Sequence, residues 1–284
     1  MRVLPTLAVG IAMCLAAQHS TSAQTLDEIV ARHLEARGGL DRLQAIRTVR
    51  IIARDPYEPV LDETLALVVI VEEKRPNLKR TTTLAPTLSA ADYEEVVRNK
   101  KGDANPLAAD QALVQYSPYR QAKTLSPLDT VTLRVAAFDG TSNWEWSQSG
   151  AEARKVPGNQ PYDFGVEGPL VDYVAKGSRV ELRGQATSRG KACFRLRVTS
   201  RQGDVRDVFV DARTFLEVAV EYQPQGASPG LQQTYDHWKR VEGVMVPHTI
   251  TTIQNARKHV RRIDKVQFNV PIDDRRFAMP TAVR

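Results

Sequence analysis

The sequence is poor in cysteine, and this excludes several kinds of protein. Among 284 residues the only cysteines are Cys14 and Cys193. Cys14 lies in an N-terminal segment that we expect to be removed, which leaves Cys193 alone. The mature chain is therefore expected to form no intramolecular disulfide and no cysteine-based zinc site. A chain of this length can build a sizeable core without such cross-links.

Three further features are weak or missing. Glycine and proline stand at 16 each, too few for a collagenous or low-complexity chain. Lys and Arg number 39 against 33 Asp and Glu, and this net charge of +6 is too diffuse to indicate a nucleic-acid partner. The longest apolar run, Leu7 to Ala17, has 11 residues, whereas a membrane-spanning helix needs about 20.

That short run has the features of a secretory signal peptide. Arg2 supplies a positive charge before it, and the small residues Thr21, Ser22 and Ala23 follow it. We expect residues 1–23 to be cleaved and residues 24–284 to form a single domain. The expected location is the periplasm, or the exterior if the host lacks an outer membrane.

The sequence offers little for catalysis. Beyond residue 23 the histidines are His33, His237, His248 and His259, and their spacing matches no metal site. A cysteine nucleophile needs a neighbouring base, and none is evident for Cys193. We expect no catalytic residue, metal or cofactor, and hence a protein that is not an enzyme.

The first structured element is expected to be a helix over Thr25 to Arg37. Its apolar residues recur at helical spacing and give one apolar face. Thr25 and Glu28 form a capping box at its start, and Gly38 with Gly39 ends it.

After Arg47 the apolar period changes from 3.6 to 2, which indicates strands. The expected strands are Thr48–Arg54, Thr64–Glu73, Leu78–Leu84, Val131–Phe138, Ser142–Ser147, Ser178–Arg183, Ala192–Thr199, Val205–Asp211, Phe215–Tyr222, Gln232–Glu242, Val246–Gln254 and Val260–Val270. Residues 85–130 form a long polar stretch that we interpret as a lid or loop insertion. Gly168 to Gly177 has the proline and glycine positions of a short helix.

Short consecutive strands with turn residues between them predict an antiparallel sheet in a mainly β (α+β) fold. The strands alternate apolar and polar residues, so one face of the sheet is apolar. Too few helices are available to cover that face, which leaves either a filled core or an apolar cavity. The expected cavity-lining positions, all apolar, are Leu133, Val135, Trp144, Phe194, Leu196, Val198, Leu216, Val218, Val266 and Phe268.

Two other features each have two interpretations. Trp144, Trp146 and Tyr162 either line a ligand mouth or fill a core. The basic run from Arg257 to Arg262 either discourages edge pairing on a solvated hairpin or contacts an anionic surface such as phospholipid headgroups.

Several segments, taken in order, resemble the outer-membrane lipoprotein-sorting proteins, relatives of the periplasmic lipoprotein carrier LolA. These segments are EIVARHLEARGGLDRLQAIRTVRI (28–51), AFDGTSNWEW (137–146), EGPLVDYVAKGSRVEL (167–182), VFVDARTFLEVAVEY (208–222), VEGVMVPHTI (241–250) and NVPIDDRRFAMP (269–280). Together they cover most of the chain after residue 23.

The resemblance implies a curved, incomplete antiparallel β-barrel closed by helices around an apolar cavity. It also implies a monomeric periplasmic carrier that binds lipoprotein acyl chains or phospholipid, with a membrane or membrane protein as donor and acceptor. The alternative is a non-enzymatic sensor or protein-interaction module that uses the curved sheet.

Overall fold

The computed structural model describes residues 24–55, 67–86, 130–148, 150, 152–157, 167–223 and 230–280. Over these residues the chain forms two α-helices and one 13-stranded sheet. The signal-peptide prediction for residues 1–23, the greater part of the expected insertion (87–129), and Tyr162 lie outside the described residues. No helix among the described residues has the length and apolarity that a membrane crossing requires.

The elements, in chain order, are α1 (Leu26–Arg37), α2 (Leu40–Ala45), β1 (Thr48–Asp55), β2 (Leu67–Lys74), β3 (Leu78–Pro86), β4 (Thr130–Phe138), β5 (Asn143–Ser147), β6 (Arg154–Val156), β7 (Arg179–Ser188), β8 (Lys191–Thr199), β9 (Val205–Asp211), β10 (Glu217–Gln223), β11 (Leu231–Val241), β12 (Val244–Gln254), β13 (Arg257–Phe268) and the 3-10 turn η2 (Asp274–Arg276).

Every pair of neighbouring strands is antiparallel, and the strand order is β6-β5-β4-β3-β2-β1-β13-β12-β11-β10-β9-β8-β7. Each strand therefore pairs with its neighbour in sequence, apart from the contact of β1 with β13. The edges β6 and β7 are not paired with each other, so the sheet is an open, incomplete barrel. The expected mainly β architecture is confirmed.

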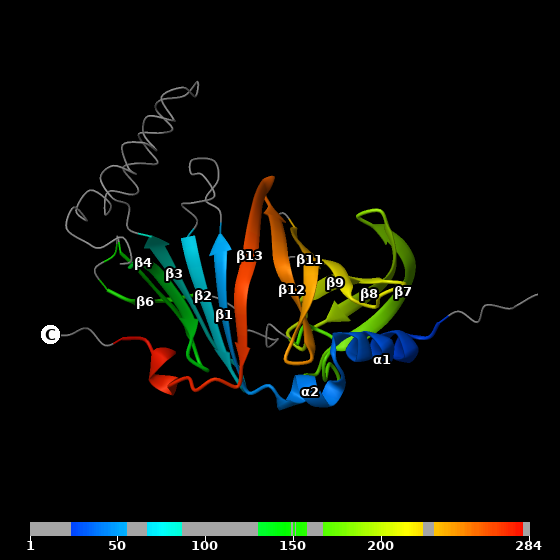
Figure 1. Cartoon of the computed structure of the whole chain (residues 1–284), viewed down its shortest axis with the longest axis horizontal. Coiled ribbons are helices and arrows are strands. Elements are labelled where there is room, and N and C mark those ends of the chain that lie inside the picture. The colour runs from blue at the N-terminus through cyan, green and yellow to red at the C-terminus, as the bar shows by residue number, and fades with distance from the viewer. Residues whose placement is uncertain are drawn as a thin grey trace, which may run out of the picture.

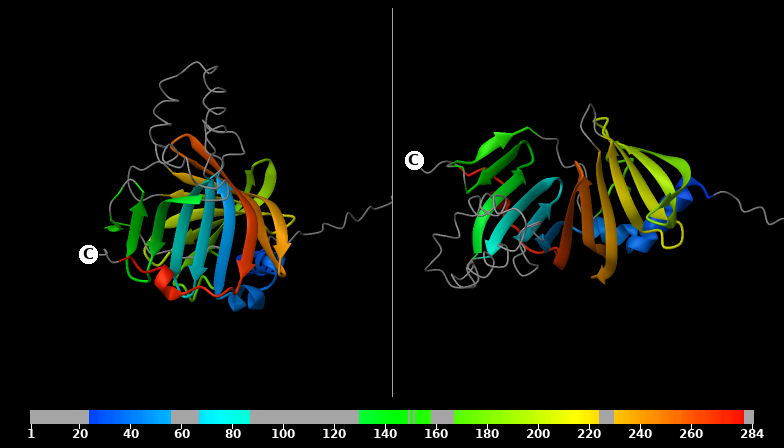
Figure 2. Two further views of the ribbon diagram at one scale, coloured as in Figure 1. Left: turned by 60° about the vertical axis from the view of Figure 1, so that its left-hand side comes forward. Right: turned by 90° about the horizontal axis from the view of Figure 1, so that it is seen from above.

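The sheet is strongly curved (Figures 1 and 2). Its curl brings Arg189, in the turn between β7 and β8, into an ion pair with Asp236 of β11. Both helices lie at the same end of the strands in Figure 1, with α1 beside β7–β9. Among the described residues the structure is therefore one curved layer with helices against one of its faces.

Helix α1 forms where the sequence predicts it. Thr25 accepts a hydrogen bond from the Glu28 backbone N–H, and the Glu28 side chain accepts one from Thr25 N–H, which completes the capping box. Ile29 and Val30 pack into a core cluster with residues of β7–β10. Fully burying such side chains contributes about 1.5–3 kcal/mol each, so the apolar stripe of α1 holds it on the sheet.

Helix α2 covers the middle of the same face. Leu43 is fully buried and shares a core cluster with β1, β12 and β13. Val49 and Ile263 belong to this cluster. We call the face against which α1 and α2 pack the helix face.

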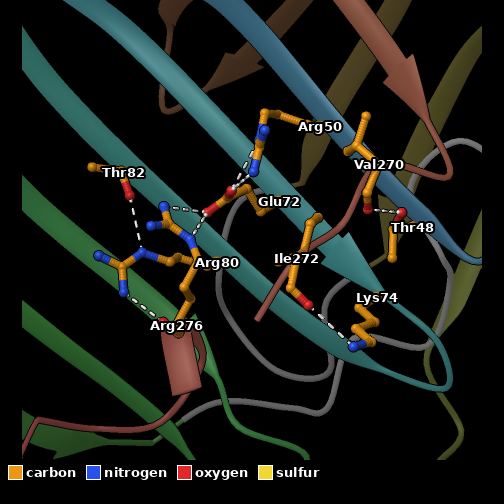
Figure 3. A network of polar contacts seen from close by, with 9 residues as sticks. All are labelled: Thr48, Arg50, Glu72, Lys74, Arg80, Thr82, Val270, Ile272 and Arg276. Atoms are coloured by element: carbon orange, nitrogen blue, oxygen red, sulfur yellow. Dashed lines mark hydrogen bonds and ion pairs between the residues drawn. The ribbon is translucent and has the colours of Figure 1, made fainter. Parts of the chain in front are cut away.

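The C-terminal segment 270–280 covers part of the opposite face, which we call the tail face. Successive residues of a strand point to opposite faces. Val49 lies on the helix face, so Arg50 and its cross-strand neighbour Glu72 lie on the tail face. Glu72 is 1% exposed and accepts hydrogen bonds from Arg50 and from Arg276 of the segment (Figure 3).

Further contacts bind this segment to the sheet. Lys74 donates to the carbonyl oxygen of Ile272 over 3.1 Å, and Thr48 donates to that of Val270 over 2.6 Å (Figure 3). Trp144 Nε1 donates to the Phe277 carbonyl oxygen over 2.7 Å. The segment is thus held by polar contacts along β1–β5.

Two local expectations are wrong. Gly168 to Gly177 forms successive turns instead of a helix, and Asp172 there has a φ of 50°, outside the right-handed helical region. In β10 a bulge between Glu217 and Ala219 breaks the alternation.

Candidate functional site

The two helices cover only part of the helix face. Their core clusters contain residues of β1 and β7–β13 and, among the described residues, none of β2–β6. Within the described ranges, the face therefore changes from an interior packed under the helices to a part at β2–β6 that neither α1 nor α2 covers, although Val69 and Val71 there are buried. Two pockets lie on this face.

The first pocket has a volume of about 80 Å³ and lies over β10–β13 and β1. Its apolar lining is formed by Ile51, Val220, Trp238, Ile250 and Ile263, with the ring of Tyr235 beside them. Arg37 and Glu217 form its polar part. We call this the apolar pocket.

The second pocket, of about 230 Å³, lies over β3–β6 and is more polar. Its lining includes Lys79, Thr81, Phe138, Asn143 and Glu145. We call this the polar pocket.

One cross-strand row links the two pockets. Ile51 of the apolar pocket pairs with Val71, and Val71 pairs with Thr81 of the polar pocket. The row continues from Thr81 to Ala136 and Glu145. Directly paired residues share a face of the sheet, so the two pockets are parts of one band that changes from apolar to polar.

An ion pair anchors α1 beside the apolar pocket. Arg37 Nη1 lies 3.1 Å from both carboxylate oxygens of Glu217, and these residues are 3% and 5% exposed. Arg37 Nε also donates to the Met245 carbonyl oxygen over 3.0 Å. Burial alone would raise the pKa of Glu217, but the charges of Arg37 and His33 and the hydrogen bonds to the carboxylate together outweigh it, and the pKa lies below its ordinary value.

His33 completes this cluster from the preceding turn of α1. Its Nδ1 lies 2.8 Å from the Phe215 carbonyl oxygen, so Nδ1 carries the proton and donates. Nε2 has no hydrogen-bond partner in the described part of the chain and lies 3.6 Å from Glu217 Oε1. Burial lowers the pKa of His33 below 6.5, which keeps the ring neutral near pH 7.

The two aromatic side chains of the apolar pocket, Trp238 and Tyr235, make polar contacts at its wall. Trp238 lies under the Arg37 guanidinium, with 5.1 Å from Cζ to the ring centroid, and packs tilted against Tyr235. Burial raises the pKa of Tyr235 well above its ordinary value, so the hydroxyl stays protonated. It donates to Gln233 Oε1 over 3.2 Å.

The polar pocket contains paired charges. Lys79 Nζ lies 2.8 Å from Glu73 Oε1, and the charge of Glu73 raises the pKa of Lys79. Glu145 accepts from Arg134 and Arg154, whose hydrogen bonds lower the Glu145 pKa. These groups are suited to polar or zwitterionic parts of a ligand.

The ten residues proposed from the sequence do not form one site. Phe194, Leu196 and Val198 lie on the helix face, but α1 fills the space above them. Val266 and Phe268 belong to the cluster under α2. These five residues are core under the helices and line neither pocket.

The other five include residues of the opposite face. Val135 and Trp144 pack near Met279 on the tail face, with Trp144 2% exposed, although Trp144 also contributes to the polar pocket. Val218 packs with Cys193 and Phe209 because the β10 bulge places Glu217, and not Val218, toward α1. Leu133 and Leu216 are half-buried and line neither pocket.

Sequence reasoning missed the residues that line the apolar pocket. Ile51, Tyr235, Trp238, Ile250 and Ile263 all lie in strands that the sequence predicts. Alternation was a usable signal for the face of Ile51, Ile250 and Ile263. It was not one for Trp238, which lies three residues from Tyr235 and follows His237, whose φ is 52°. The position of the helices over that face had no local signal either. In the described part of the chain no group of three or more His, Cys, Asp or Glu is arranged to hold a metal ion.

Comparison with solved structures finds related architectures. The chain is similar to a LolA superfamily protein from Nitrosomonas europaea, with 12% identity over 90% of this chain and 98% of that chain and a TM-score of 0.49. It is also similar to an outer membrane lipoprotein-sorting protein domain from Vibrio parahaemolyticus, with 12% identity over 88% and 94% of the two chains and a TM-score of 0.48. A DUF1329 family protein from Desulfovibrio piger follows, with 9% identity over 89% and 96% and a TM-score of 0.44.

No family model matches the chain, and no curated protein matches it. At identities of 12% or less the function has to be argued from the residues of this chain.

Proposed function

We propose that this protein is a carrier that binds an amphiphilic ligand, a lipid or a lipoprotein acyl chain, along the helix face. The observation that carries the proposal is the continuous row from Ile51 through Val71 to Thr81, which links the apolar pocket to the polar pocket. An acyl chain fits the apolar part, and a headgroup or the polar end of a lipoprotein fits the charged part.

The length of the band suits an acyl chain. From β12 to β4 it crosses five strand spacings, and at about 4.8 Å each this amounts to roughly 24 Å. A bilayer core of about 30 Å holds two leaflets, so one acyl layer is roughly 15 Å deep. The band is thus long enough for one chain and its polar end.

The pockets must widen before they hold such a ligand. About 80 Å³ lies well below the roughly 300 Å³ at which small-molecule pockets begin. A ligand therefore has to displace side chains or shift α1, whose buried Arg37–Glu217 pair resists movement. Burying about twelve methylene groups at about 0.8 kcal/mol each supplies roughly 10 kcal/mol, enough to offset part of the cost of association and opening.

The proposal predicts that filling the apolar pocket blocks binding. Ile250→Trp places a larger side chain in that pocket, and Thr251→Trp makes the same change on the opposite face of β12. The assay measures displacement of a fluorescent fatty acid by unlabelled lipid. We expect Ile250→Trp to weaken probe binding at least about tenfold and Thr251→Trp to leave it within about twofold, since tenfold corresponds to about 1.4 kcal/mol.

Equal binding by both variants and the unaltered chain would contradict the location of the site. Failure of the unaltered chain to bind any lipid probe would contradict the carrier itself, and would favour a sensor or protein-interaction module that uses the same curved sheet.

The remaining parts of the proposal concern location and chemistry. Export through cleavage after Ala23 would place the carrier in the periplasm, between a membrane or membrane-protein donor and an acceptor. No catalytic step is proposed. Gly226 to Gly230 reads GxSxG, but a nucleophile elbow joins a strand to a helix, whereas this segment joins the antiparallel strands β10 and β11.

A further inference from the structure

The β12–β13 hairpin ends in a basic tip. Asn255 and Ala256 form its turn, with φ values of 52° and 59°, as a two-residue type I′ connection requires. The tip extends beyond the ends of β1 and β2 in Figure 1 and in the left view of Figure 2. It is therefore the part of the described sheet that projects furthest at this end.

The charge of the tip is of one sign. Arg257, Lys258, Arg261 and Arg262 all lie within residues 251–263, which contain no Asp or Glu. Arg261 and His259 bind Asp55 at the base of the hairpin, over 2.7 and 3.2 Å. Arg257 and Lys258 are exposed and form no ion pair with any described residue.

An apolar pair lies among these cations. Ile253 is directly opposite Lys258, and Val260 is opposite Thr251, so all four share one face of the hairpin. Ile253 is 37% exposed, one of the few large apolar side chains at the surface of the described chain. A projecting hairpin with exposed cations and a small apolar group matches the chemistry of an anionic lipid surface.

Edge protection accounts for only part of this tip. β13 pairs with β1 from Arg262 to Phe268, so in the described part of the chain residues 257–261 extend past the end of β1 as a local open edge, where cations discourage pairing. Edge protection does not explain the exposed apolar side chain of Ile253 on the adjacent strand.

We propose that the β12–β13 tip docks the protein onto an anionic lipid bilayer, with Arg257 and Lys258 at the phosphate level and Ile253 inserted into the interface. This surface is separate from the two pockets, and the proposal does not depend on which ligand they hold. Because Ile250 lines the apolar pocket four residues before Gln254 at the tip, docking brings that pocket to within roughly 13 Å of the bilayer surface.

The test is flotation of the chain from Gln24 to Arg284 with lipid vesicles at low and high salt. The vesicles contain phosphatidylcholine alone or phosphatidylcholine with about 30% phosphatidylglycerol, which is anionic. The proposal predicts binding to the anionic vesicles only, which weakens as salt rises. Arg257→Gln with Lys258→Gln should lower the partition coefficient roughly 25-fold, at about fivefold for each cation removed.

The matched control removes two charges at the opposite end of the sheet. Arg213, in the turn after β9, and Lys239, near the end of β11, are both exposed. Arg213→Gln with Lys239→Gln should retain nearly all of the binding, and Ile253→Ser should reduce it with the charge unchanged. Circular dichroism checks that each variant is folded.

Two results would overturn the proposal. One is equal flotation of the unaltered chain with neutral and anionic vesicles. The other is an equal loss in the two double variants, which would assign the attraction to the diffuse net charge and not to the tip. Loss of fatty-acid binding with intact vesicle docking would count against the carrier function alone.

Discussion

Removal of Arg37 should reveal how strongly α1 is tied to the sheet. Arg37→Met keeps an apolar side chain at this position but removes the guanidinium charge. Glu217, which is only 5% exposed, then has a buried carboxylate without its partner. Removing one partner of a buried ion pair costs about 3–5 kcal/mol. At roughly 2–4 °C per kcal/mol for a domain of this size class, the melting temperature should fall by at least about 6 °C.

The pH dependence of this loss follows from the sign of the pKa shift. In the unaltered protein the pKa of Glu217 is lowered, so its contribution to stability is present above the ordinary value near 4.5 and is lost as pH falls through the folded-state pKa. In Arg37→Met the unpaired carboxylate has a raised pKa instead. It takes up a proton on folding, so the cost of the substitution should be smaller at pH 5 than at pH 7.5.

Urea unfolding at the two pH values measures both effects. Arg37→Met with Glu217→Gln should recover much of the loss, since no buried charge remains. Arg134→Met is the control, because that side chain is 60% exposed and its ion pair should contribute at most about 1 kcal/mol. An Arg37→Met cost no larger than that of the control, or one that does not change with pH, would refute the reasoning.

Two further predictions concern other buried polar groups. The lowered pKa of His33 means that the unfolded chain binds more protons than the folded chain below about pH 6.5, so the free energy of unfolding should fall from pH 6.5 to 5. In urea unfolding, His33→Gln should remove this part of the dependence of stability on pH. An unchanged pH dependence would count against a neutral, buried ring. Trp144→Phe should lower the free energy of unfolding by about 1–3 kcal/mol, because it leaves the Phe277 carbonyl oxygen without its buried donor. The same substitution should speed proteolysis of segment 270–280. Stability and digestion like those of the unaltered chain would show that this hydrogen bond does not hold the segment.

Local sequence signals were sufficient for most elements of this fold. The capping box of Thr25 and Glu28 gave the start of α1, and period-2 alternation gave most of the strands. Both depend on interactions between residues that are close in sequence. The antiparallel order followed because most connections are short and each strand except β6 pairs with the next.

The candidate site could not be predicted in the same way, since it depends on contacts between distant segments. Alternation says that Trp144 and Val135 share a face, but it does not say that segment 270–280 covers that face. The same pattern placed Val218 toward the interior, whereas a bulge turns Glu217 toward Arg37 instead. Leu196 did face the helices, and α1 fills the space where a cavity was expected.

The most direct test of the carrier proposal is native mass spectrometry of the chain from Gln24 to Arg284, purified from a periplasm without detergent, followed by lipid extraction of the same sample. The account predicts an added mass that extracts as phospholipid or acylated peptide, and a reduced share of it in Ile250→Trp. A clean mass for the unliganded chain that takes up no added lipid would contradict it.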